Sequence, residues 1–199
     1  MKKVIITISL ALFFSKVIFA QTSTAELDKV LNYVVKKGRL PGFGVSLFTK
    51  DSIIYSKGFG YSDIETKSAY TDATTQIVAS VSKTIVAVAL MKAQELGYLK
   101  LDDPVNKHLS FKVYNPNFPK KEISIRHLSK HSSSLLYNVF MTDSLRGKDE
   151  SGQYRNLGET LKAFLTPDGE FYKKENWMKH PPGTIGNYSN TGSALAAYI

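Results

Sequence analysis

Residues 77–98 read IVASVSKTIVAVALMKAQELGY, and this stretch decides which class of fold the chain adopts. Its apolar residues recur at helical spacing, and Gly97 follows them where a helix commonly ends. The pattern therefore predicts a helix over these residues. Its first turn holds Ser80 and Lys83 on one face, because residues three apart are neighbours on a helix surface. The apolar positions are Val81, Ile85, Val88, Ala89 and Ala93.

Ser80 and Lys83 are candidates for a nucleophile and its cationic neighbour. A hydroxyl at a helix N-terminus lies among unpaired backbone N–H groups, which stabilise an oxyanion formed beside it. A lysine carried on a mostly apolar helix is partly desolvated, which favours a role in proton transfer. The same residues also fit a capping serine followed by a solvated lysine, and a Ser-x-x-Lys match arises easily by chance in a lysine-rich chain.

A second motif, Tyr188-Ser189-Asn190, adds a phenol and an amide. It lies in the turn-rich stretch HPPGTIGNYSNTG at 180–192, before an apolar helical start at 194–199. Turn residues of this kind hold side chains at the edge of a core. The two motifs together contain most of what acyl transfer through a serine ester requires. A further Tyr-x-Asn at 154–156 lies in a charged stretch, and we interpret it as a coincidence.

Four stretches carry a resemblance to a known superfamily. They are ASVSK at 79–83, GYLKLDDPV at 97–105, ISIRHL at 123–128, and PGT at 182–184 leading into the Tyr-Ser-Asn motif. In these stretches, and over residues 27–199 as a whole, the chain resembles the serine β-lactamases and penicillin-binding proteins. The resemblance is strongest to the class C β-lactamase-related group, which also contains D-alanyl-D-alanine peptidases and esterases.

The resemblance implies an α+β fold of the β-lactamase/transpeptidase type, with an antiparallel sheet flanked by helices and a separate helical region. It implies an exported serine hydrolase that acts through a Ser80 acyl-enzyme on an amide, a β-lactam or an ester. Tyr188 would take the proton from Ser80 with its pKa lowered by Lys83, and Asn190 would bind the substrate amide or fix Lys83. The alternative is a non-catalytic penicillin-recognising domain or an inactive fragment. We expect a small-molecule or cell-wall peptide substrate, and neither a cofactor nor a metal.

The chain departs from the family pattern at two places. Residues 129–135 read SKHSSSL where the family has T-H-T-S-G-L, so Ser134 replaces a glycine and is expected to alter a turn. The third family motif, Lys-Thr-Gly or His-x-Gly on a strand, should lie well beyond Tyr188, whereas the sequence stops at Ile199. We therefore expect a chain truncated before its C-terminal strands.

Residues 1–20 have the pattern of a secretory signal peptide: two lysines, an apolar run, and Ala20 before Gln21. We expect a periplasmic or secreted protein, with residues 21–199 forming a partial β-lactamase-related domain. The apolar run is shorter than the roughly 20 residues that span a bilayer, so no stable membrane anchor is expected. The absence of cysteine excludes a lipoprotein, disulfides and cysteine nucleophiles.

The formal charge of +9 fits attraction to anionic cell-wall polymers, and it also fits a scattered lysine excess that only aids solubility. No cluster of lysines and arginines with interleaved aromatic residues indicates nucleic acid, so we expect no nucleic-acid partner. The sequence carries no prediction of the oligomeric state.

Three further elements are expected from local patterns. A capping box at 23–26 followed by helical spacing predicts a helix that ends at Gly38. Alternating residues at 43–49 and 52–58 predict a hairpin joined through Lys50-Asp51. The long segment 139–180, in which aromatic residues are spread among charges, is predicted to be an inserted lid or wall over the site.

Overall fold

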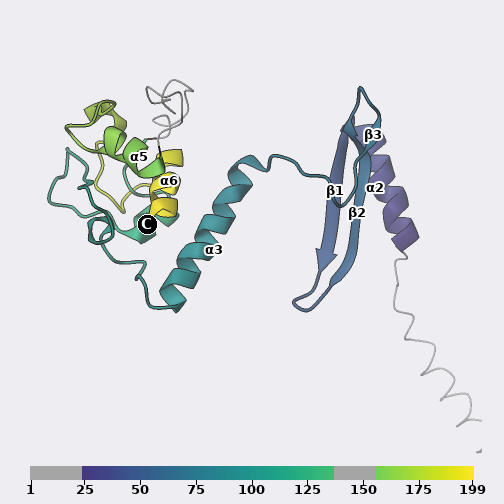
Figure 1. Ribbon diagram of the computed structural model, residues 1–199, viewed down its shortest axis with the longest axis horizontal. Coiled ribbons are helices and arrows are strands. Elements are labelled where there is room, and N and C mark those ends of the chain that lie inside the picture. Colours follow the sequence, from purple (N-terminus) through teal and green to yellow (C-terminus); the bar gives the residue numbers. More distant parts are fainter. Residues whose placement is uncertain (1–23, 137–155) are drawn as a thin grey trace, which may run out of the picture. The chain divides into compact units, whose positions relative to one another are not determined.

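The computed structural model describes residues 24–136 and 156–199, which divide into two compact units at Ile77/Val78 (Figure 1). The first unit contains α2 (Thr24–Gly38), β1 (Gly42–Phe48), β2 (Ile53–Asp63) and β3 (Ser68–Ala69). The second contains η1 (Ala79–Val81), α3 (Ser82–Glu95), η2 (Val105–Lys107), α4 (Ile125–Ser129), α5 (Leu157–Leu165), η5 (Lys174–Asn176) and α6 (Asn190–Tyr198).

The predicted signal peptide and the Ser23 end of the predicted capping box lie outside the described residues. Among the helices described, none is both long enough and apolar enough to cross a membrane.

The first unit is an antiparallel sheet of order β1-β2-β3 with α2 packed on β2. The predicted hairpin is confirmed: β1 pairs with β2 in a register that sets Val45 opposite Lys57. β2 runs five residues beyond its predicted end, because its last residues pair with the short β3. Asp28 of α2 accepts hydrogen bonds from Tyr55 (2.5 Å) and Lys57 (2.6 Å) of β2, which fixes the helix to the sheet.

The helix predicted at 77–98 forms, but its start differs from the prediction. Residues 79–81 make a 3-10 turn, and α3 begins only at Ser82. The cause is the backbone at Ala79, whose φ of 44° is incompatible with a continuous right-handed helix. The predicted C-terminus is confirmed, since Gly97 has φ 78° and its N–H donates to the carbonyl of Gln94.

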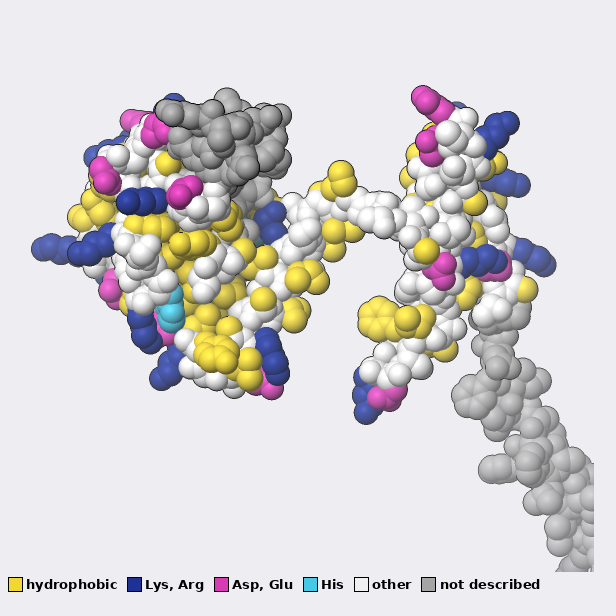
Figure 2. Space-filling view, in the orientation of Figure 1, with side chains coloured by type: hydrophobic (Ala, Val, Ile, Leu, Met, Phe, Trp, Pro, Cys, Tyr) yellow, Lys and Arg dark blue, Asp and Glu magenta, His cyan; other side chains and the backbone are white. Residues whose placement is uncertain are grey.

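The core of the second unit lies where α3, α4 and α5 meet α6. Its largest fully buried side chains include Leu128 of α4, Leu161 of α5 and Leu195 of α6. α3 contributes Leu90 to this core, whereas Ile85 and most other apolar residues of α3 are exposed. Figure 2 shows hydrophobic side chains exposed along the length of α3. Helical spacing thus located the helix correctly but did not identify the side that packs.

The lid or wall predicted at 139–180 is wrong for residues 156–180, the part of this segment that the structure describes. Residues 157–165 form α5, and Trp177 lies in the core with only 3% of its surface exposed. α5 begins at Leu157 because the side chain of Asn156 caps it by accepting a hydrogen bond from the N–H of Glu159. Its apolar face, which includes Leu161 and Phe164, is buried. The segment therefore builds the core of the second unit.

Candidate active site

Ser80 lies at the middle of the η1 turn, immediately before α3. The residue before it, Ala79, has a left-handed backbone that costs about 1–2 kcal/mol for a residue other than glycine. Such strained positions cluster at functional sites, where the fold holds them in place. The turn leaves the Ser80 side chain exposed, and Lys83 follows in the first turn of α3 as a half-buried side chain.

The hydroxyl of Ser80 is held by two side chains. Its Oγ lies 2.6 Å from the phenol oxygen of Tyr188, and the ammonium of Lys83 donates to the same Oγ over 3.1 Å. The Lys83 nitrogen also lies 5.0 Å from the centre of the Tyr188 ring. Three of the four residues predicted from sequence are therefore brought together in one hydrogen-bonded group.

The charges around Tyr188 favour its phenolate form. The hydrogen bond from the Lys83 ammonium, and to a smaller degree that from the Ser80 hydroxyl, holds the pKa of the Tyr188 phenol below its usual value of about 10. A phenolate in contact with a serine hydroxyl is arranged to accept its proton.

Tyr188 is positioned by a segment far from it in sequence. The chain from 178 to 189 runs along residues 131–136 and is fixed there by backbone and side-chain hydrogen bonds. Donor and acceptor pairs are Met178 N–H to Ser134 carbonyl (2.9 Å), Gly183 N–H to Ser132 carbonyl (2.8 Å), Asn187 N–H to His131 carbonyl (2.6 Å), and Ser134 hydroxyl to His180 carbonyl (2.8 Å).

Ser134 explains why a glycine is usual at its position. Its φ is 66°, in the left-handed region that glycine adopts freely. Ser134 therefore adopts the left-handed backbone conformation although it is not a glycine. Its hydroxyl donates a hydrogen bond to the carbonyl of His180, which offsets part of the backbone strain.

Asn190 is not joined to the other three residues. It is the first residue of α6, which begins four residues before the helical start expected at 194 because the hydroxyl of Ser189 caps it by accepting from the Gly192 N–H. Within the described part of the chain, the Asn190 amide makes no hydrogen bond with Lys83 or Tyr188. Its role in substrate binding stays a prediction.

His131 is a neighbour of the site that sequence reasoning did not assign to it. Its ring centre lies 4.6 Å from that of Tyr188, and its Nδ1 accepts a hydrogen bond from the Ser189 N–H. The sequence feature that could have assigned His131 to the site is its place in the SKHSSSL run at 129–135, because the family pattern has a histidine at the same position.

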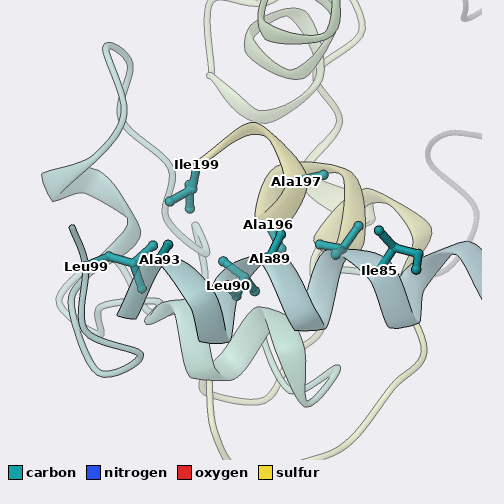
Figure 3. A pocket seen from close by; sticks show the side chains of 9 residues that line it. Ile85, Ala89, Leu90, Ala93, Leu99, Ala196, Ala197 and Ile199 are labelled. Carbon is teal, nitrogen blue, oxygen red and sulfur yellow. The ribbon is translucent and has the colours of Figure 1, made fainter. Parts of the chain in front are cut away.

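A separate apolar pocket lies between α3 and α6. Its volume is about 300 Å³, and Figure 3 shows Ile85, Ala89 and Leu90 of α3 facing Ala196 and Ala197 of α6. All nine lining residues are apolar, so this pocket offers no group for proton transfer or nucleophilic attack. Across residues 24–136 and 156–199, no three His, Asp or Glu side chains gather as metal ligands do.

Comparison with known proteins places this chain in a family. The family profile described as Beta-lactamase matches residues 27–199. The human mitochondrial serine beta-lactamase-like protein LACTB is 34% identical over 170 residues, which are 81% of this chain and 29% of that protein. The chain spans about a third of the length of the curated relatives it matches.

Two solved structures have the same fold. The octameric penicillin-binding protein homologue from Pyrococcus abyssi superposes with a TM-score of 0.64 at 26% identity, covering 87% of this chain and 37% of that one. EstCE1, described as a hydrolase with promiscuous acyltransferase activity, superposes with a TM-score of 0.59 at 26% identity, covering 85% of this chain and 44% of that one. The chain has a β-lactamase/transpeptidase-like fold and belongs to the β-lactamase family of serine hydrolases.

Proposed function

We propose that this chain carries the acylation site of an exported serine hydrolase, with Ser80 as the nucleophile. Tyr188, as phenolate, takes the proton from Ser80 Oγ while that oxygen bonds to the carbonyl carbon of the substrate. The bond from that carbon to its nitrogen or oxygen leaving group then breaks, and the leaving group takes the proton from Tyr188. Water hydrolyses the resulting ester and restores Ser80.

The contact between Ser80 and Tyr188 carries this proposal. A nucleophile and its base must lie within about 2.6–3.2 Å of one another, and the two oxygens lie 2.6 Å apart. Lys83 adds a cation 3.1 Å from Ser80 Oγ, which stabilises both the phenolate and the negative charge that develops on substrate. The Ser80 backbone N–H would donate to that oxyanion.

The substrate class is an amide, a β-lactam or an ester, drawn from small molecules or cell-wall peptides. EstCE1, described as a hydrolase with acyltransferase activity, supports acyl transfer as the reaction type. Asn190, the first residue of α6, would bind the substrate amide.

Covalent labelling tests the nucleophile. The protein is incubated with a fluorophosphonate or with a penicillin, and the labelled peptide is identified by mass spectrometry. We expect one adduct, on Ser80, that is lost in Ser80→Ala and kept in Ser82→Ala, a neighbouring exposed serine. A folded protein that takes no label would favour the non-catalytic alternative, and label on another serine would exclude this mechanism.

Export is part of the proposal and has its own test. We expect removal of residues 1–20, so that the mature protein starts at Gln21 in the periplasm or the medium. N-terminal sequencing of the exported protein checks this expectation, and an intact Met1 in a membrane fraction would contradict it.

A further inference from the structure

His131 contacts the chain on both sides of Tyr188. Its carbonyl accepts the N–H of Asn187 (2.6 Å), and its ring Nδ1 accepts the N–H of Ser189 (3.2 Å). Its ring meanwhile packs against the Tyr188 ring, with centroids 4.6 Å apart and planes inclined by 36°. One residue therefore holds the backbone N–H groups of the residues before and after Tyr188, together with the aromatic ring between them.

The backbone position of His131 is one that usually carries glycine. The residue follows the C-terminus of α4 with φ 53°, its N–H donates to Leu128, and the next N–H, that of Ser132, donates to His127. This is the arrangement that ends helices with a left-handed residue, most often glycine or asparagine. A histidine is less favourable there by about 1 kcal/mol. A residue that breaks a local rule is expected where its side chain has a function.

The hydrogen bond from Ser189 fixes the protonation state of the imidazole. A backbone N–H can only donate, so Nδ1 must carry a free lone pair and His131 must be neutral. Partial burial, assisted by the Lys83 charge, keeps the pKa of His131 below its usual value. Among the described residues, the ionisable groups near the imidazole are Tyr188 itself and Lys83 on α3, which borders the same cavity of about 40 Å³.

We propose that His131 is a positioning residue for the acyl transfer: its carbonyl and neutral imidazole hold the Asn187-Tyr188-Ser189 backbone and ring so that the phenol oxygen lies on Ser80 Oγ. The expected effect of His131 on the rate of acyl transfer rests on the proposed function. The contacts by which His131 holds Tyr188 do not depend on it. When the imidazole is protonated, it can no longer accept the Ser189 N–H, and the segment around Tyr188 loses one of the contacts by which His131 holds it.

Three variants separate the backbone, ring and acceptor contributions. His131→Gly suits the left-handed backbone but removes the ring and the acceptor. His131→Asn tolerates the same backbone and keeps an oxygen near the Nδ1 position, whereas His131→Phe keeps only the ring. His180→Asn is the control, because His180 is an exposed histidine on the segment before Tyr188.

The first measurement is the rate of fluorophosphonate labelling of Ser80 as a function of pH. We expect His131→Gly to label about 10- to 100-fold more slowly at pH 7, since small displacements of a catalytic group have effects of this size. His131→Asn should recover part of that rate. In the wild type, we expect the labelling rate to fall as the pH drops through the pKa of His131, and this fall should be absent in His131→Asn. The control His180→Asn should match the wild type at every pH.

The second measurement does not depend on activity. The tyrosine ring carbons are labelled with ¹³C, the Tyr188 signal is assigned with Tyr188→Phe, and its pKa is followed by NMR. We expect the Tyr188 pKa to rise in His131→Gly, because the phenol moves away from Lys83 and Ser80, and to rise less in His131→Asn.

Wild-type labelling rate and an unchanged Tyr188 pKa in His131→Gly would overturn the inference. If the wild type takes no label, the proposed function fails, and the NMR titration alone then decides whether His131 positions Tyr188. If His131→Gly does not fold, the same comparison is made between His131→Asn and His131→Phe.

Discussion

The hydroxyl of Ser80 and the phenol of Tyr188 lie 2.6 Å apart, although 108 positions separate them in the sequence. The contact joins the turn before α3 to the segment before α6, within one compact unit. Because Lys83 donates to the same serine oxygen, the three side chains form one coupled group. Substitutions within it should therefore have strongly non-additive effects on rate.

Removing the Lys83 charge should raise the pKa of Tyr188 and slow acylation. In Lys83→Met the phenol loses the hydrogen bond that contributes most to its lowered pKa. The rate of Ser80 labelling rises with pH as Tyr188 deprotonates, and we expect the midpoint of that rise to move upward and the rate at pH 7 to fall at least 100-fold. Lys92→Met, on the exposed side of α3, is the control and should leave the profile unchanged. An unchanged midpoint in Lys83→Met would show that this lysine does not set the Tyr188 pKa.

Ser134→Ala should destabilise the fold by about 1 kcal/mol, because it keeps the left-handed strain and loses the hydrogen bond to His180. Ser134→Gly loses the same bond but relieves the strain, so we expect it to be more stable than Ser134→Ala. Ser133 is a useful contrast: its buried hydroxyl has no partner among the described residues, and Ser133→Ala should be neutral or stabilising. Denaturant unfolding measures all three. Equal loss of stability in the Ser134 variants would argue against strain at this turn.

Stability should fall in acid through Asp103. Hydrogen bonds from the Lys100 N–H, the Lys107 ammonium and the His108 ring lower the pKa of its carboxyl to about 2. Because the folded pKa is depressed, the stabilisation is complete above the usual aspartate pKa near 4 and is lost as the pH falls toward about 2.

The free energy of unfolding should therefore decline less steeply over that range in Asp103→Asn than in the wild type. Asp51→Asn, in the exposed hairpin turn, should follow the wild-type curve. The same slope in Asp103→Asn as in the wild type would exclude Asp103 as a source of the acid sensitivity.

Asn115→Ala should cost about 2 kcal/mol of stability and displace the lead-in to Tyr188. Asn115 is fully buried, and its amide donates to the carbonyls of Met178 (2.9 Å) and His180 (3.4 Å). Its removal takes one donor from each of these carbonyls and leaves a cavity at a fully buried position. Thermal unfolding and Ser80 labelling together test this expectation. Asn32→Ala, on the exposed face of α2, is the comparison variant and should change neither the unfolding temperature nor the rate of Ser80 labelling.

Local patterns in the sequence determined much of the secondary structure and the identity of the site. The period of apolar residues located α3 and the hairpin, and Gly97 marked the helix end, because periodicity and caps depend on neighbours along the chain. The motifs around Ser80, Lys83 and Tyr188 were identifiable for the same reason, since each is a short run of residues.

Other features depend on contacts between distant segments, which no local pattern encodes. Where α3 meets α6, Leu90 is buried, whereas Ile85 lines the open pocket between the two helices and stays exposed. Trp177 lies in the core although its segment reads as polar. The left-handed backbone at His131 and its two hydrogen bonds around Tyr188 follow from the way residues 131–136 meet residues 178–189. The sequence named the candidate side chains, and the tertiary structure alone set the distances between them, because those distances are fixed by packing across the whole unit.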